Sequence, residues 1–265
     1  MFRWIARVGL ITVTFLWAHQ ASSDTYRRES YSFELPGLSL KQVQEAVVAN
    51  LTGQSGSLVW DRSLCYRVAK GDLDDRQRVD QLVSRLNAEV PLDIRPCPQN
   101  ADPVIIFYFS QGKFGADDRA AIRALAGNPS GINESLAHFV EGSAGCYWDF
   151  RVDVANQPYA DLGITISGLR NAPTSGLVAV NTAVSNAADS EKCLFLGAVS
   201  VFGLAFPLGA EPAYSGKIDQ KTEDELTLLS LFVLYVVAED GRGWSSGELA
   251  AKIRSILFVM HELGK

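Results

Sequence analysis

The stretch Pro103-Val104-Ile105-Ile106-Phe107-Tyr108-Phe109 decides how this chain is expected to fold. The six residues after the proline are all β-branched or aromatic, which favours a strand over a helix. Both faces of such a strand are apolar, so both faces must be covered by other elements. The stretch is therefore predicted to be a central strand of a sheet.

Upstream of this strand, short strands and amphipathic helices are expected to alternate. A strand is predicted over 31–35, and Ser39 with Gln42 forms the capping-box pattern that begins a helix. A second strand is predicted over 58–68. Residues 72–75, Asp-Leu-Asp-Asp, then place acids at the positive end of a helix dipole, and apolar residues recur after them at helical spacing.

Downstream, the pattern predicts mixed elements first and helices last. Short helices are expected over 117–125 and 133–140, further strands over 146–154, 163–167 and 177–180, and long helices over 190–206, 223–238 and 246–263. Two helical stretches are apolar nearly all round but too short to cross a bilayer, so they are expected to be buried. The predicted fold is a single α+β domain over 24–265, a mixed sheet with packed helices and a helical C-terminal third.

Residues 1–23 have the features of a signal peptide. Arg3 and Arg7 make the start basic, and residues 8–17 form an apolar run that is too short for a membrane anchor. Small residues at 21–23 would permit cleavage before Asp24. The alternative is an N-terminal helix that stays attached. We expect a periplasmic or secreted protein.

The four cysteines, Cys65, Cys97, Cys146 and Cys193, all follow this leader. An even number of cysteines in an exported chain is typical of disulfides. Three connectivities are possible, and we favour Cys65–Cys97 with Cys146–Cys193, which joins successive segments. No two cysteines have the C-x-x-C spacing of a zinc site.

The charge balance argues against several classes of partner. The chain has 24 Lys and Arg against 30 Asp and Glu, a net charge of −6 that becomes −8 without the leader. A negative chain without a basic cluster is a poor partner for nucleic acid or an anionic membrane surface. Only His138 and His261 follow the leader, which excludes a histidine-rich zinc site. We expect no nucleic-acid partner and no stable membrane insertion after signal removal.

No stretch of the sequence carries a complete catalytic motif. Ser130, in Gly-Asn-Pro-Ser-Gly, stands one position too late to match the Gly-x-Ser-x-Gly pattern of serine hydrolases. His261-Glu262 is not followed by the second histidine of the His-Glu-x-x-His pattern of zinc peptidases. The carboxylates that a fold could pair as acid and base are Glu141, Asp149, Asp153 and Asp161. We therefore predict no catalytic, cofactor-binding or metal-ligating residue.

Residues 193–204 read Cys-Leu-Phe-Leu-Gly-Ala-Val-Ser-Val-Phe-Gly-Leu. Together with Val59-Trp60, the strand around Tyr66, the acid-started helix after it and Leu234-Tyr235, this stretch resembles the domain of unknown function 2927 family of exported proteobacterial proteins. In that family the helix reads Cys, about three residues, Glu-Glu, a Gln and Gly-Leu. Cys193, Gly203 and Leu204 stand in the matching register.

The resemblance implies a fold and an inactive site. The family's Glu-Glu-x-x-Gln helix is similar to the His-Glu-x-x-His helix of zinc peptidases, which implies a zincin-like α+β fold. In this chain Leu196-Gly197 replaces the glutamates and Ser200 the glutamine. A zinc peptidase needs two ligands and a general base on one helical face, and these residues supply none.

The function that follows from these observations is binding rather than catalysis. We expect an exported, disulfide-stabilised protein that binds another envelope or extracellular component and uses no cofactor. One alternative is a cryptic hydrolase, either a degenerate zinc peptidase or one using carboxylates such as Glu141 or Asp149. Another is a membrane-associated protein that uses 193–206 or 226–238 as an interfacial element.

Overall fold

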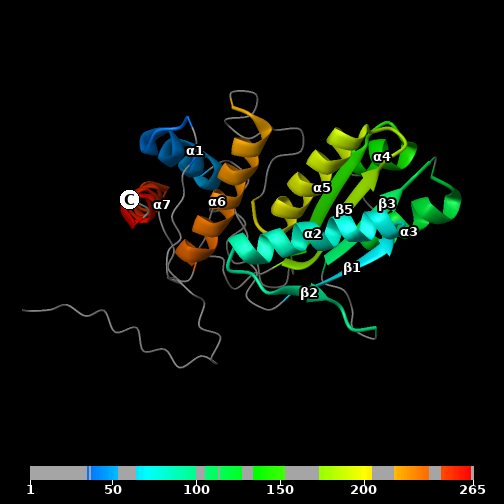
Figure 1. The fold of residues 1–265 in the computed structure, drawn as a ribbon. Helices are drawn as coiled ribbons and strands as arrows, with labels where there is room; N and C mark the ends of the chain where they lie inside the picture. Colours follow the sequence, from blue (N-terminus) through cyan, green and yellow to red (C-terminus); the bar gives the residue numbers. More distant parts are fainter. Residues whose placement is uncertain are drawn as a thin grey trace, which may run out of the picture.

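The structure is a computed structural model that describes residues 35, 37–52, 64–99, 105–112, 114–126, 134–152, 173–204, 218–238 and 246–263. It is an α+β fold with a mixed five-stranded sheet and a helical C-terminal region (Figure 1). The elements are α1 (Leu40–Thr52), β1 (Leu64–Lys70), α2 (Leu73–Glu89), β2 (Ile94–Pro96), β3 (Ile105–Ser110), α3 (Ala116–Ala126), α4 (Glu134–Glu141), β4 (Cys146–Val152), β5 (Pro173–Asn181), α5 (Ala187–Val201), α6 (Gln220–Ala238) and α7 (Ser246–Leu263). The predicted fold class is confirmed.

The apolar strand β3 lies in the middle of the sheet, as its sequence predicts. The strand order is β2-β1-β3-β5-β4, with β4 antiparallel to β5 and the other four strands parallel. In this register Phe107 lies opposite Val68 on one side and Val178 on the other. Phe107 is completely buried, because neighbouring strands flank it and helices cover its face.

The side chains of β3 alternate between two separate cores. Ile105, Phe107 and Phe109 belong to a core that includes α2 and α5 and continues into α1, α6 and α7. Tyr108 points to the other face, where it joins a smaller cluster with Phe139 of α4 and residues of α3. Figure 1 shows α1, α6 and α7 gathered beside the sheet, with α6 between them and α5.

The predicted helix starts are confirmed by their caps. Gln42 Oε1 accepts a hydrogen bond from Ser39 N at 2.9 Å, and Gln42 N donates to Ser39 Oγ at 3.4 Å. At the start of α2, Asp72 and Asp75 form the same reciprocal pair. No helix in the described ranges is long and apolar enough to cross a bilayer.

One strand was not predicted, and several element boundaries differ from the prediction. β2 was not predicted, because only three residues form it and the last is a proline. β5 begins at Pro173, four residues before the predicted 177. α5 ends at Val201 rather than 206, because Gly203 has a φ of 133° and the amides of Gly203 and Leu204 bond back to Ser200 and Val199, a Schellman-type ending.

Several predicted segments lie outside the described residues. These are the leader 1–23, residues 31–34 and 58–63 of two predicted strands, the strand over 163–167, and the extensions of 146–154 and 190–206 beyond 152 and 204.

Two disulfides join elements of the sheet to their neighbours. Cys65 of β1 is bonded to Cys97, just after β2, and Cys146 of β4 is bonded to Cys193 of α5. This is the connectivity that the sequence favours. Two disulfides are typical of a protein that folds in an oxidising compartment.

Candidate functional site

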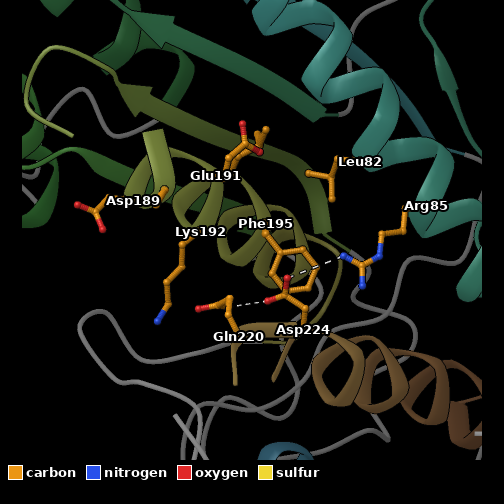
Figure 2. Close-up of a pocket in the computed structure, with 10 residues that line it drawn as sticks. Leu82, Arg85, Asp189, Glu191, Lys192, Phe195, Gln220 and Asp224 are labelled. Atoms are coloured by element: carbon orange, nitrogen blue, oxygen red, sulfur yellow. Dashed lines mark hydrogen bonds and ion pairs between the residues drawn. The ribbon is translucent and has the colours of Figure 1, made fainter. Parts of the chain in front are cut away.

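A cleft opens where α2, α5 and α6 meet, on the face of the sheet that carries the larger core. Its volume is about 620 Å³, within the range of small-molecule and side-chain pockets. The lining residues come from positions far apart in the sequence: Leu82, Arg85, Ala188, Asp189, Glu191, Lys192, Leu194, Phe195, Gln220 and Asp224 (Figure 2).

Arg85 and Phe195 contact each other on the lining of the cleft. The guanidinium carbon of Arg85 lies 5.6 Å from the centroid of the Phe195 ring, a cation–π contact. Arg85 Nε donates to Glu89 Oε1 at 3.1 Å, one turn further along α2. Its Nη1 lies 3.9 Å from Asp224 Oδ2, which is an ion pair without a hydrogen bond. Arg85 is therefore held mainly by its own helix.

Asp224 of α6 is the incompletely neutralised acid of the cleft. Gln220 Nε2 donates to its Oδ1 at 2.7 Å, and Figure 2 shows the carboxylate facing Arg85 and the Phe195 ring. None of the described residues donates a hydrogen bond to its Oδ2. Burial raises the pKa of Asp224, and the Gln220 hydrogen bond and the charges of Arg85 and Lys192 offset only part of this increase.

The next residue along α6 carries a second poorly compensated carboxylate. The side chain of Glu223 is only 5% exposed, and Lys192 Nζ, on the lining of the cleft, lies 4.0 Å from its Oε1. That oxygen has no hydrogen-bond partner within the described part of the chain. Glu223 itself does not line the cleft, so its contribution there is made through Lys192.

The two remaining acids of the cleft already have partners. Glu191 Oε1 accepts from Arg78 Nη1 at 3.0 Å. Asp189 lies in the first turn of α5 and accepts from Asn186 Nδ2 at 2.6 Å, as part of the helix cap. Carboxylates outnumber cations along the lining, and the one without a full set of partners is Asp224 on α6.

The positions matched by the family resemblance lie on another side of α5. A Cβ added to Gly197 would meet Val178 Cγ1 at 2.7 Å and Trp148 Cβ at 3.5 Å, so the helix packs directly on β4 and β5 there. Ser200 is 2% exposed, and its Oγ finds no partner among the described residues. Neither residue lines the cleft, and a glutamate at 197 would have no room.

Of the four acids that the sequence suggests, the two that the structure describes, Glu141 and Asp149, do not line the cleft. Glu141 is exposed at the end of α4, and Asp149 on β4 accepts a hydrogen bond from Tyr147 Oη at 2.9 Å. Burial and the Asp149 charge raise the pKa of Tyr147, so that the phenol remains protonated. Ser130, Asp153 and Asp161 lie outside the described residues. Nowhere in the described ranges do three His, Cys, Asp or Glu side chains gather as a metal site would require.

Sequence reasoning missed the cleft because its residues carry no motif. Arg85 lies on a polar helix face, and Glu223 and Asp224 look like the acids that favour any helix start. Only the packing of α2, α5 and α6 brings them together. A scan of protein-family models, a search of curated proteins and a search of solved structures each found no match to this chain.

Proposed function

We propose that this chain is an exported binding protein without catalytic activity, and that the cleft between α2, α5 and α6 binds another envelope or extracellular component. The signal-peptide features of residues 1–23 and the two disulfides support export to the periplasm or beyond. The observation that carries the binding proposal is the cleft itself, which combines an aromatic side chain with incompletely paired charges.

The structure of α5 supports a non-catalytic role for the residues at the family positions. We propose that the chain is a divergent member of the domain of unknown function 2927 family with a zincin-like fold. In that proposal the polar side chains of the zinc helix have been replaced by residues that pack on the sheet. Gly197 against Val178 is the clearest case, because the contact leaves no space for a general base.

Site-specific photocrosslinking tests the binding proposal. A benzophenone amino acid placed at Leu82, inside the cleft, should give an adduct with one envelope component when the full chain is expressed in its host. The matched control is Leu73 on the same helix, which is 70% exposed and does not line the cleft. Adducts of equal intensity from both positions, or none from Leu82, would refute binding at the cleft.

A carboxylate-based hydrolase is the second candidate, and one observation favours it. The raised pKa of Asp224, in a cleft that also holds Asp189 and Glu191, is what a general acid needs. If this candidate is correct, the protein will hydrolyse a glycoside or peptide substrate, and Asp224→Asn will abolish that activity while Glu225→Gln leaves it intact. Absence of turnover across a panel of chromogenic glycosides and peptides would argue for binding alone.

A further inference from the structure

We propose that the cleft between α2, α5 and α6 recognises a primary ammonium group carried on an alkyl stem, such as a diamine or the side chain of a lysine. This inference rests on the proposed function, which places binding at the same cleft. It adds the chemical class of the group that is bound.

The second carboxylate oxygen of Asp224 favours a cation in the cleft. Asp224 Oδ2 receives no hydrogen bond from a described residue, and its nearest described cation, Arg85 Nη1, is 3.9 Å away. An ammonium group has three donors and is compact, so one placed beside Asp224 could donate the hydrogen bond that Arg85 does not make.

The apolar side chains of the cleft suit an alkyl stem. Leu82, Leu194 and Phe195 lie on its lining together with the charged groups, and Figure 2 shows the Phe195 ring beside the Asp224 carboxylate. Lysine-like chains pack their methylene groups on apolar surface while the charged head reaches a polar partner. An ammonium at Asp224 would therefore have apolar surface for its stem within the same cleft.

An anionic ligand fits less well. The two cations of the lining each have a carboxylate neighbour already, since Arg85 donates to Glu89 and Lys192 lies near Glu223. The chain as a whole is also negative, with a net charge of −6 that becomes −8 without the leader. A net negative charge raises the concentration of cations near a protein and repels anions.

Calorimetric titration of the full mature chain tests the inference. The probes are 1,5-diaminopentane, 1,5-pentanediol as its uncharged counterpart, and Nα-acetyl-lysine N-methylamide with and without acetylation of its side-chain amine. We expect the charged probes to bind at one site, and the diol and the acetylated lysine not to bind. Stronger binding of the free diamine would identify a polyamine ligand, and stronger binding of the lysine derivative a peptide-borne lysine.

Two isosteric variants locate the site. Asp224→Asn should weaken binding of the ammonium probe about tenfold, the effect of removing one charge-assisted hydrogen bond. Glu225→Gln removes the same charge from the next residue, which pairs with Lys221 and does not line the cleft, and should change the affinity less than about twofold. Circular dichroism of both variants verifies the fold.

The possible outcomes separate this inference from the proposed function. Equal weakening by both variants, or equal binding of the diol, would overturn the ammonium assignment. If Leu82 crosslinks to a partner while no ammonium probe binds, the proposed function stands and the inference is wrong. If the ammonium probe binds at Asp224 but no envelope component crosslinks, the chemistry of the site is correct and the macromolecular partner is not.

Discussion

The two faces of the sheet differ in how far their cores extend. On the α2/α5 face, the core runs from the strands through α5 and α6 to α1 and α7 without interruption. On the other face, a small cluster under α3 and α4 is built around Phe114, Phe139 and Tyr147, with ring centroids 5.1 and 6.0 Å apart. The cleft opens on the first face, where a further layer of helices adds a wall; among the described residues, the helices on the other face are α3 and α4.

This difference shows how a site arises in the fold. A helix packed on a sheet buries one stripe and exposes the rest, so α3 and α4 leave their outer faces exposed to solvent. On the α2/α5 face a further helix, α6, packs against both α2 and α5, and charged residues at the three-way junction are only partly covered. Because of this partial burial, nearby positive charge compensates the carboxylate of Asp224 only in part.

The largest expected effect is the loss of unfolding free energy when one buried ring is removed from each of the two cores. Phe107→Ala and Phe139→Ala each remove a fully buried ring, for which about 3–5 kcal/mol of unfolding free energy is expected to be lost. Phe107 should lie at the upper end of that range, because strands on both sides hold its surroundings in place. Phe139 should lie at the lower end, because the eight-residue helix α4 can shift to fill the space. Urea denaturation of both variants would measure the difference, and a larger loss for Phe139 would contradict the comparison.

A smaller effect tests how closely α5 approaches the sheet. Gly197→Ala should destabilise the protein by about 1–2 kcal/mol, because the new methyl group would overlap Val178 Cγ1. The cost of this overlap should exceed the gain in helix propensity that alanine brings. Gly247→Ala in α7 is the matched control, since a Cβ there meets nothing within 4 Å and should leave stability equal or higher. Thermal unfolding of the two variants decides the question. A stabilising Gly197→Ala would show that the helix has room for a larger residue.

The smallest expected effect comes from comparing one carboxylate on each face of the sheet, Asp118 and Asp224. Hydrogen bonds from Lys70 and Tyr108 to Asp118, at 2.6 Å each, lower the pKa of that carboxyl, whereas burial raises the pKa of Asp224. Ionised Asp118 therefore stabilises the fold at neutral pH, and this contribution is lost as the pH falls through its folded pKa. Ionised Asp224 opposes folding at neutral pH, and that penalty is absent at a pH low enough to protonate it in both states.

The matched variants should consequently change stability in opposite directions. At pH 7 Asp118→Asn should lower the unfolding free energy by a few tenths of a kcal/mol to about 1 kcal/mol, and Asp224→Asn should raise it by a few tenths, because both sites are partly screened by water. At acidic pH both differences should shrink toward zero. Chemical denaturation at the two pH values provides the measurement, and a loss of stability in Asp224→Asn at pH 7 would show that Arg85 already neutralises this acid.

Most of the fold could be predicted from the sequence, because its signals are local. The apolar residues of β3 predict a central strand, and the caps at Ser39 and Asp72 predict the starts of α1 and α2. β2 could not be predicted, since three residues carry no usable periodicity and this strand exists only through pairing with β1. The end of α5 has a sequence signal in Gly203, but the apolar run through it suggested a longer helix.

The candidate site was decided by tertiary structure alone. By itself the sequence determined the longer strands and the positions of the helices, because hydrogen bonding within a few residues and side-chain periodicity are properties of short segments. The cleft depends on Arg85, Phe195 and Asp224, which are more than 20 residues apart and meet only when α6 packs against α2 and α5. Burial then changes their chemistry, since the raised pKa of Asp224 results from desolvation that no local pattern encodes.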